Sequence, residues 1–187
     1  AVSETTKNLG KVAPDWTMGI SNTLRYRNLS LSFLIDVRYG GVMYSGTVSD
    51  LRVNGMAEET IGKNRTDIVD KGVKQDGTEN TTAITPYQFW SNNYSSKVSE
   101  ANVFDATFVK LREMVLSYQM PQRWFKNCFI GSLALGVEGR NLWLMKSNVP
   151  HIDPETNIFG PSAVGSGVEY SAIPTTRSWG FNIKLTF

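Results

Sequence analysis

The sequence predicts an all-β fold, an antiparallel up-and-down sheet of the transmembrane β-barrel kind. Five segments alternate large apolar residues with small or polar ones, and side chains on a strand point to opposite faces in turn. The connections between these segments are alternately short and long. Aromatic residues gather at both ends of the segments, where membrane barrels carry their aromatic girdles.

The first two strands are predicted over residues 15–26 and 29–39. In the second, Leu29, Leu31 and Phe33 begin an apolar series that continues on every other residue to Tyr39. Only Arg27 and Asn28 separate the two segments, which predicts a tight hairpin.

The other three strands are predicted over residues 107–118, 132–143 and 178–187. In the first of these the apolar phase slips at Glu113, which indicates a β-bulge. The last segment has the clearest alternation of all. Its apolar positions are Trp179, Phe181, Ile183, Leu185 and Phe187.

Charged residues follow the same period. All but one fall on the polar phase of their strand, and Glu113 at the proposed bulge is the ambiguous one. One face of the sheet is therefore expected to be nearly free of charge. The charges assigned to the other face are Asp15, Arg25, Asp36, Arg38, Lys110, Arg112, Glu138, Arg140 and Lys184.

The long connections, residues 40–106 and 144–177, should leave the same end of an up-and-down sheet. Long extracellular loops and short periplasmic turns are typical of outer-membrane barrels. The expected girdle is Trp16, Tyr39, Trp143 and Trp179 near the long connections, and Tyr26 and Tyr118 near the short turns, with Trp124 in a turn.

Composition narrows the class of function. A net charge of +2 over 187 residues implies no strong electrostatic attraction to nucleic acid, and no apolar run is long enough for a membrane helix. Cys128 and His151 are each the single residue of their type, which excludes an internal disulfide and a multi-histidine metal site. The chain begins with Ala and has no leader-like segment, so we expect it to be part of something longer.

No motif predicts catalysis, a cofactor or a metal, and we expect no enzymatic activity. Asp153 and Glu155 flank Pro154 and fit a turn better than an acid/base pair. Residues 76–80 lack the spacing of a calcium loop, and residues 165–167 do not continue into a nucleotide-binding motif. Cys128 is expected to be a packing thiol.

Several motifs, in order along the chain, resemble the SusC/RagA family of TonB-dependent outer-membrane transporters from Bacteroidetes. Residues 108–121, FVKLREMVLSYQMP, resemble a family strand and turn of the form LR-x-x-x-L-x-Y-x-x-P. Residues 139–142, GRNL, and 153–155, DPE, are similar to two further family motifs, and residues 173–187 to the family's ending. DWTMG at 15–19 and YGG at 39–41 also fit.

The resemblance implies that residues 1–187 are about the last five strands of a plugged barrel of about 22 strands, in the outer membrane of a Gram-negative, Bacteroidetes-like bacterium. The plug and the TonB box would lie outside these residues. Implied partners are a SusD-like lipoprotein, the TonB complex, outer-membrane lipid, the barrel assembly machinery and an oligosaccharide or peptide substrate, with no nucleic acid. The assembly signal would be the terminal strand with Phe181, Ile183, Leu185 and Phe187.

Two questions stay open at the level of sequence. An aromatic cluster in the first long connection either contacts a sugar or peptide ligand or the lid, or merely packs this loop onto the barrel or the lid; it comprises Tyr87, Phe89, Trp90 and Tyr94. The alternative to a nutrient importer is a secreted soluble β-sandwich that binds glycans. A sandwich needs a second sheet to cover the apolar face of the first.

Overall fold

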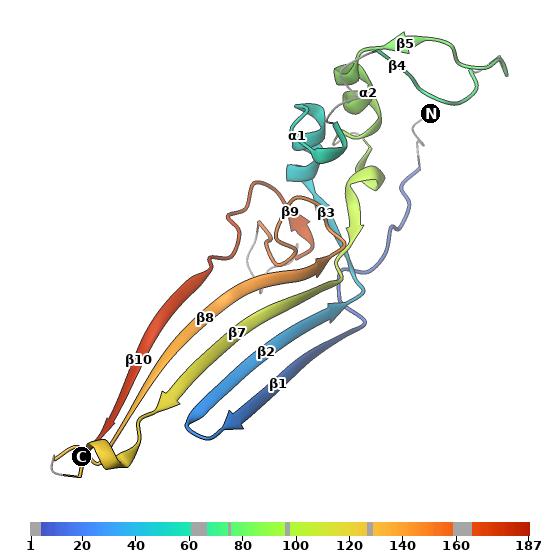
Figure 1. Cartoon of the computed structure of the whole chain (residues 1–187). Coiled ribbons are helices and arrows are strands. Elements are labelled where there is room, and N and C mark those ends of the chain that lie inside the picture. Colours follow the sequence, from blue (N-terminus) through green and yellow to red (C-terminus); the bar gives the residue numbers. More distant parts are fainter. Residues whose placement is uncertain (1–4, 61–66, 75, 96–97, 127–128, 159–165) are drawn as a thin grey trace. The chain divides into compact units, whose positions relative to one another are not determined.

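Five long strands form one antiparallel sheet in the order β1-β2-β7-β8-β10 (Figure 1). Each long strand pairs with the next long strand along the chain, so the sheet is an up-and-down meander. The predicted bounds differ little from those observed, except that β8 ends at Ser147 rather than at Trp143. The strands are β1 Trp16–Tyr26, β2 Leu29–Tyr39, β7 Phe108–Gln119, β8 Ser132–Ser147 and β10 Ser178–Thr186.

This computed structural model describes residues 5–60, 67–74, 76–95, 98–126, 129–158 and 166–187, which divide into two units. We call them the sheet unit, which contains the long strands, and the loop unit, which contains the α-helices and short strands. The sheet unit comprises Pro14–Gly40, Ala106–Asn148 and Thr175–Phe187. The loop unit comprises Ala1–Ala13, Gly41–Asp105 and Val149–Pro174.

The predicted hairpin between β1 and β2 is present. The strands pair from Trp16 opposite Tyr39 down to Tyr26 opposite Leu29, which leaves Arg27 and Asn28 as the turn. Arg27 adopts a φ of 52°, in the left-handed region that such short turns require. Asn28 Nδ2 donates to the Gln119 carbonyl at 2.6 Å, and the Gln119 amide donates back to the Asn28 carbonyl at 2.8 Å. The turn is therefore fixed to the end of β7.

The predicted bulge is also present, one residue before the expected position. Leu34 pairs with Glu113 and Ile35 pairs with Leu111, which leaves Arg112 as the extra residue of β7. The register between β7 and β8 shifts at the same place. An extra residue returns the apolar series of β7 to the face used by the neighbouring strands.

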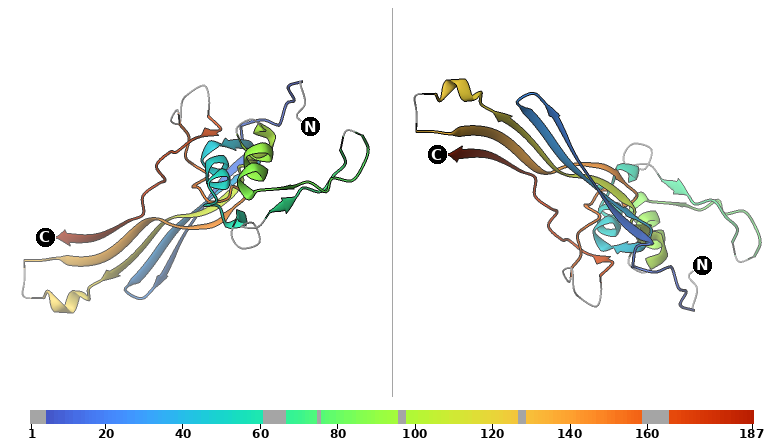
Figure 2. Two further views of the ribbon diagram at one scale, coloured as in Figure 1. Left: turned by 90° about the horizontal axis from the view of Figure 1, so that it is seen from above. Right: turned by 90° about the horizontal axis from the view of Figure 1, so that it is seen from below.

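The register places the apolar series of all five strands on one face. One row of paired residues runs across the sheet through Leu24, Leu31, Leu116, Val137 and Phe181. Figure 2 shows that the sheet is curved and open, and that β1 and β10 form its two edges. The two long connections leave the sheet at one end, since Tyr39, Phe108, Ser147 and Ser178 all lie toward it.

The loop unit contains two small sheets, β6-β3-β9 and β4-β5, whose strands have two to four residues. No sheet large enough to cover the five long strands, as a β-sandwich would require, occurs among the described residues. None of the described helices is long and apolar enough to cross a membrane. The elements are β3 Val42–Ser45, α1 Gly46–Val53, η1 Glu58–Thr60, β4 Ile68–Val69, β5 Ala83–Ile84, α2 Pro86–Asn93, η3 Ser99–Asn102, β6 Val103–Asp105 and β9 Val168–Glu169, with η4 Gln122–Trp124 in the sheet unit.

A buried carboxylate joins β9 to the start of α1. Glu169 is almost fully buried and accepts hydrogen bonds of 2.6 Å from the hydroxyls of Ser45 and Thr47. Ser45 is also the N-cap of α1, where its Oγ accepts from the Val48 amide. Helix α2 has a capping box of Thr85 and Gln88, so both short helices begin at a side-chain cap.

Candidate functional site

The polar face of the sheet carries the charged side chains that the sequence assigned to it, and some of them are paired. Arg112, the extra residue of the bulge, forms a salt bridge with Asp36 of β2. Its Nη1 also donates to Asn141 Oδ1 of β8 at 3.3 Å. The bulge therefore aims one guanidinium at two neighbouring strands, a role that no alternation pattern could predict.

The same face holds the segment that enters β10. Lys110 is 3% exposed, and its Nζ donates to Thr175 Oγ1 at 2.8 Å. Asn141 Nδ2 donates to the Thr176 carbonyl at 3.0 Å. Buried cations are costly unless they are paired or hydrogen-bonded, so this face is organised as a polar surface.

The apolar face, in contrast, is exposed over much of the sheet. Phe181 is 86% exposed, and its neighbours in the row across the sheet are also accessible. Soluble monomers rarely expose apolar patches of this extent. The exposed side chains of this face include Trp16, Met18, Ile20, Leu24, Leu116, Val137, Trp179, Phe181, Ile183 and Leu185.

The aromatic residues predicted to form girdles lie toward both ends of this sheet. Trp16 and Tyr39 are paired across β1 and β2, and their rings stack with centroids 5.2 Å apart. At the short-turn end, Tyr26 and Tyr118 both pair with Leu29. All six side chains are exposed: Trp16, Tyr26, Tyr39, Tyr118, Trp143 and Trp179. Their function as a girdle stays a prediction.

The aromatic cluster of the loop unit divides into packed and accessible rings. The Trp90 ring lies 4.6 Å from Tyr94 and 5.3 Å from Phe89, measured between centroids. Trp90 is 7% exposed, whereas Tyr87 is 64% exposed. The cluster therefore contains an internal packing core, and Tyr87 is the ring most able to meet a ligand or a partner.

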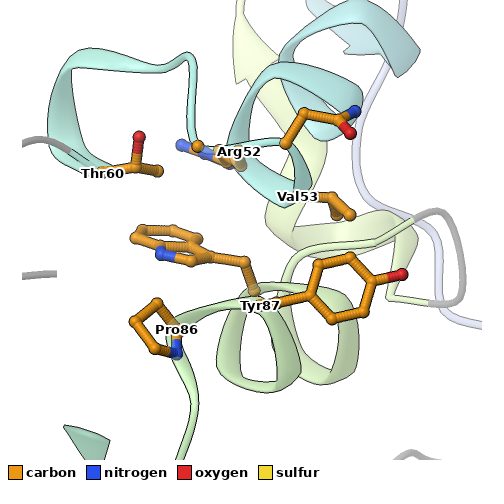
Figure 3. Close-up of a pocket in the computed structure, with 8 residues that line it drawn as sticks. Arg52, Val53, Thr60, Pro86 and Tyr87 are labelled. Atoms are coloured by element: carbon orange, nitrogen blue, oxygen red, sulfur yellow. The ribbon is translucent and has the colours of Figure 1, made fainter. Parts of the chain in front are cut away.

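A hollow of about 490 Å³ lies beside Tyr87 (Figure 3). Pro86 and Tyr87 at the start of α2 face Arg52 and Val53 of α1 across it, with Thr60 at its rim. Its lining mixes ring surface with polar groups. That combination suits a ligand with both apolar and hydrogen-bonding surface.

Sequence reasoning missed the central residue of this region, Arg52. Its guanidinium lies 5.2 Å from the centroid of the Tyr94 ring and 5.3 Å from that of Phe104. Its Nε donates to Glu59 at 2.7 Å, and its Nη1 donates to the Ala101 carbonyl at 2.9 Å. Arg52 thus holds α1, α2 and η3 together. No local motif marks such a residue, because its partners are far apart in sequence.

Glu59 connects Arg52 to His151. The second oxygen of Glu59 lies 2.7 Å from His151 Nε2. Partial burial alone would raise the pKa of Glu59, but the hydrogen bonds from Arg52, its own backbone amide and His151 outweigh burial and lower the pKa to about 2. His151 therefore takes part in a side-chain contact within the loop unit.

We expect the loop unit to lose stability as the pH falls from about 4.5 toward about 2. The pKa of Glu59 is depressed in the folded state, so its contribution is present above the ordinary carboxyl pKa and is lost as Glu59 takes up a proton. Hydrogen-exchange protection of α1 in the detergent-solubilised parent protein would measure this loss. The difference in α1 protection between Glu59→Gln and the parent should shrink as the pH falls across that range. Protection in the neighbouring variant Glu58→Gln should follow that of the parent. A constant difference between Glu59→Gln and the parent would contradict the assignment.

The remaining sequence motifs are structural where the structure describes them. Asp153 Oδ1 accepts from the Glu155 amide at 3.2 Å, so this pair forms a turn around the buried Pro154. Asp76 accepts from the amide and hydroxyl of Thr78, which lowers the pKa of its carboxyl. The described residues contain no cluster of metal-ligating side chains. Cys128 and Gly165 lie outside the described residues.

Known proteins that resemble this chain include TonB-dependent receptors. No family model matches the chain. It is similar to two TonB-dependent receptors of Formosa agariphila: P3, 25% identical over 185 residues, and P26, 26% identical over 182 residues. These alignments cover 97% and 96% of this chain but 17% and 18% of the receptors. The chain thus spans less than a fifth of the curated relatives it matches.

Solved structures of the RagAB peptide importer share the fold. The closed-closed state gives a TM-score of 0.64 at 21% identity, and covers 94% of this chain and 18% of the neighbour. The open-open state gives 0.59 at 19% identity, with 94% and 17% covered. The curated relatives are TonB-dependent receptors, and the solved neighbours share the fold of this chain. Together these similarities support a fragment of SusC/RagA type, in agreement with the resemblance carried by its motifs.

Proposed function

We propose that the full protein imports a nutrient across the outer membrane, and that this chain forms about the last five strands of its barrel wall. The observation that carries the proposal is the five-stranded open meander with charges on one face and exposed apolar side chains on the other. A barrel wall meets lipid on its outer face and a polar lumen on its inner face. A soluble sandwich would instead bury the apolar face.

The loop unit would lie outside the cell and the short turns would lie in the periplasm. Cysteine labelling of intact cells tests this orientation, in a parent protein with Cys128→Ser. Lys74→Cys, on an exposed part of the loop unit, should react with an impermeant maleimide. Gln122→Cys, in the short turn at η4, should react only after the outer membrane is permeabilised. Equal labelling of both positions in intact cells would overturn the proposed orientation.

The proposal includes partners that act on the whole protein. A SusD-like lipoprotein would close the extracellular mouth, and the TonB complex would supply energy through a region outside this chain. The name of the structural neighbours supports a peptide as cargo, while an oligosaccharide is the other class that the family resemblance implies. Uptake of labelled peptide and oligosaccharide by cells with and without the receptor separates the two.

Tyr87 is the residue we would test first for contact with cargo or lid. Tyr87 is exposed and borders the hollow, whereas Trp90, which also lines the hollow, is buried and packs against Phe89 and Tyr94. Tyr87→Ala should reduce uptake or lipoprotein binding without changing the amount of receptor in the membrane. Trp90→Ala is the contrasting variant, because it removes the packed core and should destabilise the loop unit itself. Unchanged uptake and lipoprotein binding in Tyr87→Ala would remove this residue from the proposal.

Deletion of Phe187 should lower the amount of assembled receptor in the outer membrane, because the terminal aromatic residue is proposed as a signal for the barrel assembly machinery. Phe187 is exposed and stacks on Phe129, with ring centroids 5.8 Å apart. Phe129→Ala is therefore the matched control, since it removes the same ring contact but keeps the terminal residue. Immunoblotting of outer-membrane fractions measures the result. If Phe129→Ala and the deletion reduce assembly equally, the ring contact explains the effect and the signal role is wrong.

A further inference from the structure

Two hollows meet at the short-turn end of the sheet. The first, of about 530 Å³, is lined by Arg27 and Arg123 together with residues of the two turns. The second, of about 520 Å³, runs over the apolar face beside Leu116, Leu135 and Phe181. Leu29 and Tyr118 line both, so the basic hollow continues into the apolar one.

The basic hollow is built on a fixed part of the backbone. The paired hydrogen bonds between Asn28 and Gln119 hold the hairpin turn to the end of β7. Arg27 lies over the Tyr26 ring at 5.4 Å, which places its guanidinium beside a residue of the apolar face. Arg123 comes from η4, the helical turn that follows β7 (Figure 1).

The positive charge in this hollow has no acidic partner among the described residues. None of its lining residues is acidic, and neither Arg27 nor Arg123 forms a salt bridge with a described residue. Guanidinium groups bind phosphate oxygens through paired hydrogen bonds. The second hollow contains no charged residue, and its side chains are mainly aliphatic and aromatic. One ligand with an anionic phosphate and an adjoining hydrocarbon chain would satisfy both hollows.

From this geometry we infer that the short-turn end of the sheet binds an anionic glycerophospholipid. The phosphodiester lies between Arg27 and Arg123, and an acyl chain lies along the apolar groove past Leu116 toward Phe181. The inference rests on the proposed function, because the apolar face must meet the membrane. It adds a lipid site of defined charge to what would otherwise be a uniform hydrocarbon contact. Such a site would favour anionic lipid around this part of the barrel.

Native mass spectrometry of the full-length receptor in detergent tests the site, with phosphatidylglycerol and phosphatidylcholine of equal chain length as probes. The parent should retain phosphatidylglycerol in preference to phosphatidylcholine. Retention of phosphatidylglycerol should fall about fivefold in Arg27→Gln or Arg123→Gln and about twenty-fold in the double variant. Arg25→Gln is the matched control, since Arg25 belongs to the polar face at the same end of β1.

A second variant and a competitor separate lipid from a simple anion. Leu116→Gln should weaken the binding of long-chain phosphatidylglycerol but leave the binding of the short-chain dihexanoyl form unchanged. Inorganic phosphate should not displace the long-chain lipid. Three results would each overturn the inference. They are displacement of the lipid by phosphate alone, equal retention of phosphatidylglycerol and phosphatidylcholine, and a loss of retention in Arg25→Gln equal to that in Arg27→Gln or Arg123→Gln. A receptor that passes the cysteine-labelling test and still shows one of these results disproves the lipid site and leaves the proposed function intact.

Discussion

Phe33→Arg should lower the free energy of unfolding of the membrane-inserted parent protein by about 2–4 kcal/mol. Phe33 lies in the middle of β2, where it pairs with Asn22 on β1 and Met114 on β7. It belongs to the apolar face, which we propose meets hydrocarbon. A guanidinium there must be dehydrated or must reach for the membrane interface. Denaturant titration of the parent protein in phospholipid vesicles measures the loss.

Ser32→Arg is the control for this variant, because Ser32 is the preceding residue of the same strand and points to the polar face. It pairs with Thr23 and Val115, and its hydroxyl lies 3.2 Å from the Thr23 hydroxyl. The arginine should cost no more than this hydrogen bond, about 0.5–1.5 kcal/mol. The same added charge on two faces thus isolates the effect of lipid. Similar losses in the two variants would show that the faces are wrongly assigned.

The sheet was predictable because one physical rule governs each of its strands. The barrel wall that we propose would separate hydrocarbon from a polar interior, so apolar and polar residues would alternate wherever the strand is regular. The rule located β1 and β2 to within a residue. It also detected the bulge, because an extra residue shifts the phase of every residue that follows it.

The rule failed where the backbone is irregular. β8 continues past Trp143 to Ser147, but its alternation is interrupted at Asn141, which has a φ of 51°. The register with β7 shifts there and again beyond Val109. A period of two cannot be followed through two irregularities within one strand, so the prediction stopped too early.

The loop unit was beyond sequence reasoning for a different reason. Its elements are joined in part by single polar contacts between residues far apart in the chain, such as Glu169 with Ser45 and Glu59 with His151. A single sequence carries no periodic signal for such pairs. The aromatic cluster was visible as a group of rings, but Arg52, which packs on Tyr94 and fixes its position, was not.

Expressed by itself in water, this 187-residue chain should aggregate or require detergent. Two features of the sheet lead to this expectation. Among the described residues β1 and β10 each pair on one side only, and unpaired edges of this length template association with other chains. The face that carries Phe181 and Ile183 is also left without lipid, and exposed apolar patches of this size are rare on soluble monomers.

The soluble fraction after expression, followed by analytical ultracentrifugation and calorimetry, provides the measurement. The double variant Phe181→Ser and Ile183→Ser should increase the soluble fraction, because it removes two exposed side chains from the apolar face of β10. Asn182→Ser lies between them on the polar face and should leave the soluble fraction unchanged. Both variants keep the same open edge, so the comparison separates the contribution of the apolar face from that of the edge. If the unmodified 187-residue chain is soluble and monomeric and melts cooperatively, this result would contradict the barrel-wall proposal and favour a soluble β-sandwich.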